Sequence, residues 1–162
     1  MIFRDLAKNL EEKWNKGKVI VLIGPRQVGK TTLINFILKD KDYLFLDGDD
    51  NTVADILANA NTENLKSIIG NYKYVFIDEV QRIPNIGLKL KIMVDQIKDV
   101  QVIVSGSSSL DINNVTQEPL TGRKFEFQMF PVSWQEFENS VGYIKAQQQL
   151  ESQQFTHSTG GG

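Results

Sequence analysis

The stretch GPRQVGKTT, which begins at Gly24, combines glycines, a lysine and threonines at a spacing that suits phosphate binding. Gly24, four further residues, Gly29, Lys30 and Thr31 match the pattern G-x-x-x-x-G-K-[ST], between a strand predicted over residues 19–23 and a predicted helix. The glycines let successive backbone N–H groups point inward, and the N-terminal end of the helix adds its dipole. The loop is therefore predicted to bind phosphate.

The side chains of this loop predict a nucleotide and Mg²⁺ as its ligands. Lys30 would reach the β- and γ-phosphates, and the Thr31 hydroxyl would bind the metal ion. An ordinary glycine-containing turn is the alternative, but it leaves the lysine and the threonine unexplained. The predicted nucleotide-binding residues, of which the last mainly continues the helix, are Gly24, Pro25, Arg26, Gln27, Val28, Gly29, Lys30, Thr31 and Thr32.

Two adjacent acids, Asp78 and Glu79, end the apolar run YVFIDE. An acid at the carboxyl end of a strand can bind Mg²⁺, as in P-loop NTPases, and we assign this role to Asp78. Glu79 is suited to orient or deprotonate an attacking water, a general-base role that typically contributes about 10²–10⁴-fold. The alternative is a solvated turn. P-loop kinases acting on small molecules generally lack the second acid, so the pair favours hydrolysis.

The serine cluster SGSSS follows the predicted strand over residues 100–106. Ligands of open α/β sheets bind outside the carboxyl ends of the strands, so these hydroxyls would face the same crevice as the glycine loop. We assign Ser107 to the γ-phosphate or the attacking water, with Ser105 and Ser108 as close alternatives. Serine and glycine clusters are also common in loops that bind nothing.

Arg123, just before a predicted strand over residues 124–130, is the candidate for an arginine finger on the γ-phosphate. It would act within its own chain or from a neighbouring subunit, and we favour the neighbouring subunit. A solvated charge or a structural ion pair is an equal alternative. Arg26 and Arg82 are ambiguous for the same reason.

Apolar runs and helical spacings alternate along the chain. The pattern predicts a three-layer α/β domain with a mostly parallel sheet. The predicted strands cover residues 19–23, 43–47, 72–78, 100–106 and 124–130. The predicted helices cover residues 2–14, the segment after the glycine loop, and residues 52–59, 62–69 (closed by Gly70), 85–98 and 115–121, with a last helix beginning at the Ser133–Glu136 capping box.

Composition narrows the classes of function. The chain has 162 residues, no cysteine and a single histidine, which excludes disulfides, thiolate metal sites and a histidine-based triad. A net charge of −2 gives no electrostatic indication of nucleic-acid binding, although a local basic face stays open. No apolar run reaches the roughly 20 residues of a membrane span, and the N-terminus is unlike a secretory signal. We expect a cytoplasmic protein with one P-loop core over residues 1–145 and a polar linker or tail over residues 146–162.

Four motifs in order, GPRQVGKTTL, VFIDEVQRIP, VIVSGSSSL and LTGRKFEFQMFPVSWQEF, resemble those of prokaryotic predicted AAA-superfamily ATPases that carry an uncharacterised C-terminal domain. The resemblance spans nearly residues 1–140. It implies ATP and Mg²⁺ as ligands and a five-stranded sheet of order 5-1-4-3-2. It also matches Lys30, Thr31, Asp78 and Glu79 to the family's nucleotide and metal residues, and the serines to its sensor strand.

Members of that family typically continue well beyond the PVSWQEF segment, so the resemblance implies a missing C-terminal domain as a partner. A homo-oligomer is a further expectation that the sequence leaves open. Three functions remain: an ATPase that turns over slowly and drives or gates the attached module, an ATP-dependent switch whose bound state matters more than turnover, and a P-loop phosphotransferase. Glu79 and the lack of an evident acceptor-binding lid count against the third.

Overall fold

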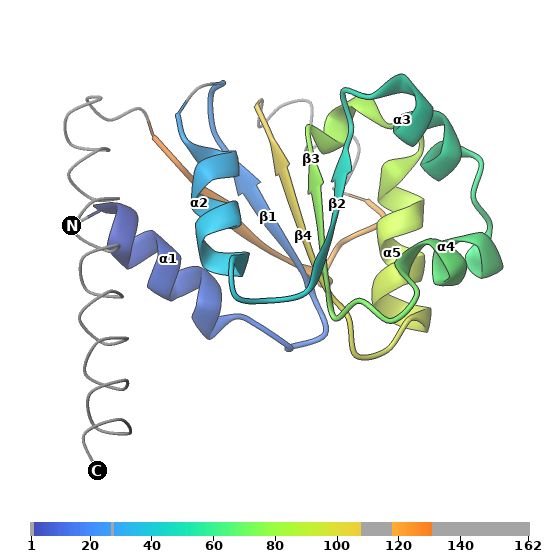
Figure 1. Ribbon diagram of the computed structural model, residues 1–162, viewed down its shortest axis with the longest axis horizontal. Helices are drawn as coiled ribbons and strands as arrows, with labels where there is room; N and C mark the ends of the chain where they lie inside the picture. The colour runs from blue at the N-terminus through green and yellow to red at the C-terminus, as the bar shows by residue number, and fades with distance from the viewer. Residues whose placement is uncertain (1, 27, 108–117, 131–162) are drawn as a thin grey trace, which may run out of the picture.

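The computed structural model describes residues 2–26, 28–107 and 118–130. Its centre is a five-stranded sheet in which every pair of neighbouring strands is parallel, in the order β2-β3-β4-β1-β5 (Figure 1). Read from the other edge, this is the order 5-1-4-3-2 that the family resemblance implies, so that prediction is confirmed. The strands are β1 (Val19–Ile23), β2 (Tyr43–Asp47), β3 (Tyr74–Asp78), β4 (Gln101–Gly106) and β5 (Lys124–Gln128).

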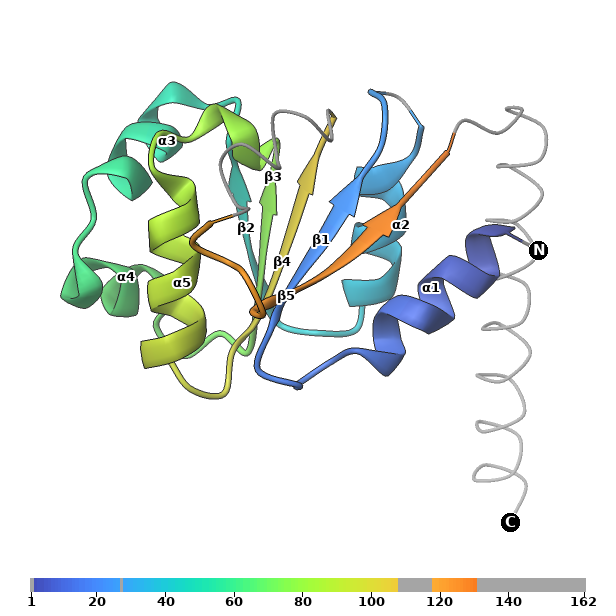
Figure 2. The same cartoon turned by 180° about the vertical axis from the view of Figure 1, so that it is seen from behind.

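Helices cover both faces of the sheet, which confirms the three-layer architecture. Figures 1 and 2 show α1 and α2 on one face and α3, α4 and α5 on the other. In the described part of the chain, no helix is long and apolar enough to span a membrane. The helices are α1 (Ile2–Glu12), α2 (Lys30–Leu38), α3 (Asn51–Ala58), α4 (Thr62–Ile69) and α5 (Ile86–Gln96), with a short 3₁₀ turn, η1 (Val80–Arg82), after β3.

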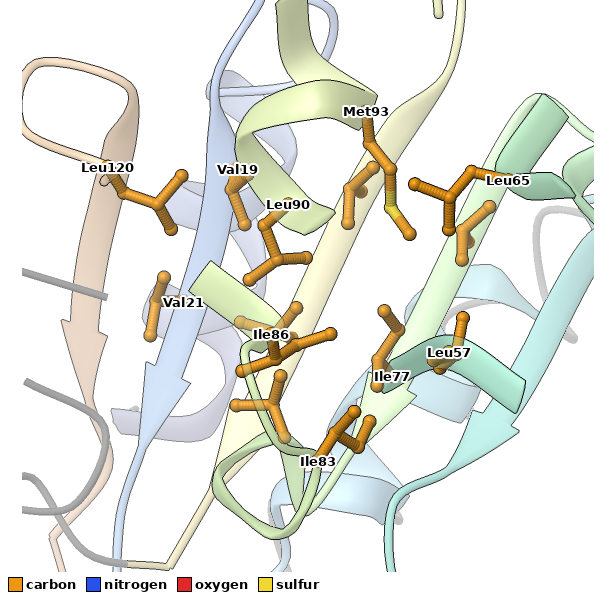
Figure 3. Packing of buried hydrophobic residues seen from close by; sticks show 14 of the residues in the cluster. Val19, Val21, Leu57, Leu65, Ile77, Ile83, Ile86, Leu90, Met93 and Leu120 are labelled. Atoms are coloured by element: carbon orange, nitrogen blue, oxygen red, sulfur yellow. The ribbon is translucent and has the colours of Figure 1, made fainter. Parts of the chain in front are cut away.

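Side chains of β1 alternate between two hydrophobic layers, because successive strand residues point to opposite faces. Val19 and Val21 join the core beneath α3, α4 and α5, whereas Ile20 and Leu22 join the core beneath α1 and α2. All five residues of the strand are buried, as its continuous apolar run predicts. Figure 3 shows the first of these layers, to which the helices contribute Leu57, Leu65, Ile86, Leu90 and Met93.

Most predicted boundaries agree with the structure to within two residues, and turns account for two of the differences. Residues 72 and 73 are not in β3, because the Tyr72 N–H donates to the Ile69 carbonyl in a turn that follows α4. Residues 118–122 form turns rather than the end of the helix predicted over 115–121. The helix predicted at Ser133 and the polar tail lie outside the described residues.

Parallel strands bring their carboxyl ends to one edge of the sheet. Ile23 of β1 is in register with Gly106 of β4, and Asp47 of β2 is in register with Asp78 of β3. The glycine loop, the acid pair and the serine cluster each lie at or directly after one of these strand ends. The topology therefore brings together three motifs that lie far apart in the sequence.

Candidate functional site

Backbone hydrogen bonds hold the loop between β1 and α2 against the end of the sheet. The Gly24 N–H donates to the Gly106 carbonyl at 3.1 Å, and the Met129 N–H donates to the Ile23 carbonyl at 2.7 Å. A Cβ at Gly24 would lie 2.5 Å from the Met129 carbonyl oxygen, so the approach of the chain after β5 requires glycine here. Gly29 has a φ of 101°, which glycine adopts without strain. Both glycines of the motif thus meet a backbone requirement.

Lys30 begins α2, and its ammonium group turns back into the loop. Its Nζ donates to the carbonyl oxygens of Gly24 at 2.6 Å and Pro25 at 2.8 Å. Burial lowers the pKa of Lys30, and the nearby carboxylates of Glu79 and Asp78 partly oppose this shift. An ammonium has three N–H donors, so two are used by the loop and one is left for a phosphate oxygen.

Thr31 and Asp78 place two oxygen ligands side by side. The Thr31 hydroxyl donates to Asp78 Oδ2 at 2.9 Å. The other carboxylate oxygen of Asp78 accepts from the Ser105 hydroxyl at 2.5 Å and from the Glu79 N–H at 2.9 Å, which fixes its orientation. Mg²⁺ prefers oxygen ligands, with one or two from the protein and the rest from water and phosphate. The donors present fit that ion.

Glu79 adopts an unusual backbone conformation at the head of η1. Its φ of 48° is left-handed, a region that costs a non-glycine residue of order 1–3 kcal/mol. The side chain is buried, and its Oε2 accepts from Gln81 Nε2 at 2.7 Å and from the Ser107 hydroxyl at 3.2 Å. Arg26 Nη2 lies 3.8 Å from the same oxygen. The proposed base is therefore held by groups from three segments.

Gly48, after β2, packs against the backbone of the acid pair. Its N–H donates to the Asp78 carbonyl at 2.8 Å. A Cβ at this position would lie 2.7 Å from the Asp78 carbonyl oxygen and would overlap the carbonyl oxygen of Glu79. The close contact keeps the turn at residues 78–79 in place from the neighbouring strand.

A cleft of about 330 Å³ opens beside these groups at the carboxyl edge of the sheet. Basic residues and acids meet in it, so it offers positive groups to a phosphate and oxygen ligands to a cation. The residues that line it are Arg26, Gly29, Lys30, Thr31, Thr32, Asp49, Asp78 and Glu79.

The remaining predicted loop residues fall into different places. Thr32 lines the cleft. Val28 is buried in the core beneath α1 and α2, so its side chain supports the loop rather than facing the cleft. Pro25 is exposed and contributes its carbonyl to Lys30. Gln27 lies outside the described residues.

The structure gives separate contacts to two serines of the predicted cluster. Ser105 is fully buried and bonds to Asp78, whereas Ser107, the residue assigned from the sequence, bonds to Glu79. Both acids thus have a hydroxyl partner from the end of β4. Ser108 lies outside the described residues.

Arg123 does not reach the cleft of its own chain. It precedes β5, and its carbonyl accepts from the Val19 N–H at the amino end of β1. A strand of five residues separates that end from the glycine loop, about 16 Å at the usual rise per residue. Its Nε bonds to both carboxylate oxygens of Asp95, at 3.0 and 3.2 Å. A finger acting within the same chain is therefore ruled out by position, and the structural ion pair is present.

Three residues of the site were not assigned from the sequence. Asp49 lines the cleft and lies 3.5 Å from Arg82, in the acidic turn DGDDN. The position of that turn after the strand next to β3 was the available signal. Gly48 and Gln81 gave no signal, because their roles depend on contacts between chain segments.

Comparison with known proteins assigns the sequence to a family. Residues 16–138 match the family described as AAA domain. Two curated relatives, the uncharacterized proteins Mb2031c of Mycobacterium bovis and Rv2008c of Mycobacterium tuberculosis, are each 32% identical over 121 residues. The match covers 74% of this chain and 26% of each relative, so the chain spans about a quarter of their length.

Three solved structures share the fold at low sequence identity. The Walker-type ATPase PABY2304 of Pyrococcus abyssi has a TM-score of 0.61 and 16% identity, over 88% of this chain and 56% of that one. The RuvB Holliday junction branch migration motor of Thermotoga maritima has a TM-score of 0.53 and 18% identity, over 79% of this chain and 43% of that one. A chain in the structure of Drosophila ORC bound to DNA has a TM-score of 0.58 and 13% identity, over 82% of this chain and 92% of that one. The match to the family over most of the chain shows that this protein belongs to the AAA-domain family of P-loop ATPases.

Proposed function

We propose that this chain is a Mg²⁺-dependent ATPase domain that hydrolyses ATP slowly and drives or gates an attached C-terminal module. One observation carries the proposal: Lys30, Thr31, Asp78 and Glu79 line a single cleft at the carboxyl edge of the sheet. An ammonium, a hydroxyl and two carboxylates in that arrangement provide for phosphate binding, metal binding and water activation together.

The chain's own groups have separate tasks in this mechanism. Lys30 and the loop N–H groups hold the β- and γ-phosphates, while Thr31 and Asp78 would hold Mg²⁺ directly or through water. The metal ion, when bound, neutralises charge that develops on the phosphate oxygens. Glu79 accepts a proton from the water that attacks the γ-phosphorus, as the bond from that phosphorus to the β-phosphate oxygen breaks. Arg26, in the loop, adds a positive charge at the rim.

The position of Arg123 supports slow turnover by a single chain. Arg123 pairs with Asp95 at the amino edge of the sheet, so it supplies no charge to the γ-phosphate bound by its own chain. The same observation favours the second candidate function, a switch in which the ATP-bound state itself is the signal. The two functions share the binding site and differ only in the rate of the chemical step.

The attached module and the other partners are also part of the proposal. The match covers only 26% of each curated relative, which supports an ATPase domain working within a longer protein. We propose a cytoplasmic location and a nucleotide as the main ligand. The net charge of −2 gives nucleic acid no electrostatic support, although one structural neighbour is described as bound to DNA.

Phosphate release with MgATP tests the proposal directly. Glu79→Gln keeps the shape of the side chain and removes the base, so it should bind MgATP normally and release phosphate about 10²–10⁴-fold more slowly. Asp78→Asn should instead weaken the Mg²⁺-dependent part of ATP affinity. Glu63→Gln is the matched control, because Glu63 is an exposed acid on α4 and should leave both properties unchanged.

Two outcomes would contradict the hydrolytic function. No phosphate release above background from either the wild type or Glu79→Gln, with tight MgATP binding in both, would favour the switch. Absence of MgATP binding in the wild type would contradict both candidates.

A further inference from the structure

Gln81 links the proposed base to the end of β4. The Nε2 group of Gln81 donates to Glu79 Oε2 at 2.7 Å and to Ser107 Oγ at 3.2 Å. The Ser107 hydroxyl in turn donates to Glu79 Oε2 at 3.2 Å. Three side chains from the turn after β3 and the end of β4 thus form a closed triangle of hydrogen bonds.

The chemistry of the triangle fixes the orientation of the Gln81 amide. Nε2 has two N–H donors, and one points to each partner. The reversed amide would place its carbonyl oxygen against the carboxylate, where both groups accept and neither donates. In the observed orientation Oε1 is buried without a hydrogen-bond partner among the described residues. An unpaired buried acceptor is energetically unfavourable. We therefore infer that the two hydrogen bonds donated by Nε2 offset this cost and are the contribution of Gln81 at this position.

The contacts of Glu79 show what those bonds accomplish. Among the described residues, Gln81, Ser107 and Arg26 all approach Oε2 of the carboxylate. The left-handed backbone of Glu79 and the close packing of Gly48 fix the other end of the side chain. With its backbone and one oxygen held, Glu79 has Oε1 left for a water in the cleft.

We propose that Gln81 is the positioning residue for the general base: it anchors Oε2 of Glu79 and couples that carboxylate to Ser107. Gln81 touches no substrate in this arrangement and acts through Glu79. The inference rests on the proposed hydrolytic function and adds a residue to it that the nucleotide-binding motifs do not contain.

Gln81→Leu removes both donors while keeping a side chain of similar bulk. Because a misplacement of about 1 Å in a catalytic group can cost about 10²-fold, we expect single-turnover phosphate release to fall by roughly 10- to 100-fold. MgATP affinity should stay within about threefold of wild type, since Gln81 does not line the cleft. Gln96→Leu, at the exposed end of α5, is the matched control and should leave both quantities unchanged.

A double variant separates positioning from a general loss of structure. If Gln81 acts through Glu79, Gln81→Leu should cause no further loss of rate in the Glu79→Gln background. An equal further loss in both backgrounds would overturn the proposal. A Gln81→Leu rate within twofold of wild type would overturn it as well.

A spectroscopic readout tests the contact without turnover. The side-chain amide resonances of Gln81, identified by their loss in Gln81→Leu, should shift in Glu79→Gln and in Ser107→Ala. Unchanged resonances in both variants would show that the triangle does not exist and would overturn the proposal while leaving the hydrolytic function standing. If the Gln81 resonances shift in both variants but the wild type releases no phosphate, the triangle exists and hydrolysis is refuted. A role for Gln81 in that reaction is then refuted as well.

Discussion

Lys30→Met is the sharpest test of nucleotide binding in this structure. The substitution keeps an apolar stem in a position that is only 5% exposed, and it removes the ammonium that donates to the Gly24 and Pro25 carbonyls. Pro25 is exposed, so water can replace the lost donor at its carbonyl. The variant should therefore remain folded, which thermal unfolding checks.

The expected loss of affinity follows from the donors of Lys30. Two N–H groups are used by the loop, and the third is available to phosphate. A hydrogen bond involving a charged group contributes about 1.5–3 kcal/mol, which corresponds to about 10- to 150-fold in dissociation constant. Asp78 and Glu79 stay beside the phosphate in the variant and repel it, so we expect the upper half of that range.

Calorimetric titration with MgATP measures the effect, and Lys89→Met is the matched control. Lys89, on α5, also donates its Nζ to a backbone carbonyl, that of Ala60, at 2.7 Å, but it does not line the cleft. Its replacement should leave the dissociation constant within about twofold of wild type. Equal MgATP affinity in Lys30→Met and wild type, with both proteins folded, would refute the assignment of the loop as the phosphate site.

Three further predictions concern Lys30, Gly48 and Arg123. Burial lowers the pKa of Lys30 in the folded protein, so between that lowered pKa and the ordinary value of 10.5 the unfolded chain binds more protons than the folded chain. The unfolding free energy of wild type, relative to that of Lys30→Met, should therefore rise with pH across this range. Denaturant titrations at several pH values measure this difference. Gly48→Ala should lower the unfolding free energy by about 1–3 kcal/mol and slow phosphate release, because the added methyl group meets backbone carbonyls. If Arg123 acts on a second molecule, phosphate release per molecule should rise over a roughly hundredfold range of protein concentration, and Arg123→Ala should abolish the rise.

Each of these predictions has a result that would contradict it. A flat pH dependence of the stability difference would show that Lys30 keeps its ordinary pKa. Gly17→Ala is the comparison for Gly48→Ala: position 17 has open space but a φ of +73°, so it should cost about 1–2 kcal/mol without changing phosphate release. Equal effects of the two alanines on release would contradict the packing argument. A rate per molecule that is independent of concentration would remove Arg123 from the mechanism.

The fold could be predicted from the sequence because its signals are local. A buried parallel strand such as β1 is recognisable as a continuous apolar run between turn residues, and Gly70 marks the end of α4 in the sequence. The strand order could not be read from such patterns. The pairing of strands depends on packing between distant segments, which local patterns do not reveal. The order was instead implied by the family resemblance.

The site was predictable to the extent that it consists of residues at strand ends. Lys30, Thr31, Asp78 and Glu79 were assigned from motifs, and the structure brings all four to one cleft. Their partners were not predictable, because they depend on the path of the chain. Gln81 reaches Glu79 only because the backbone turns through a left-handed conformation at that residue.

Strand direction decides what Arg123 can do, and the sequence already contained that information. Residues that follow parallel strands share the carboxyl edge with the nucleotide, whereas Arg123 precedes β5 and lies at the amino edge. Contact with a nucleotide therefore requires a second molecule whose carboxyl edge meets this amino edge, in place of the partly exposed pair with Asp95. Such a contact depends on association. At high dilution Arg123→Ala should leave the rate of each molecule unchanged, whereas Lys30→Met should impair binding at every concentration.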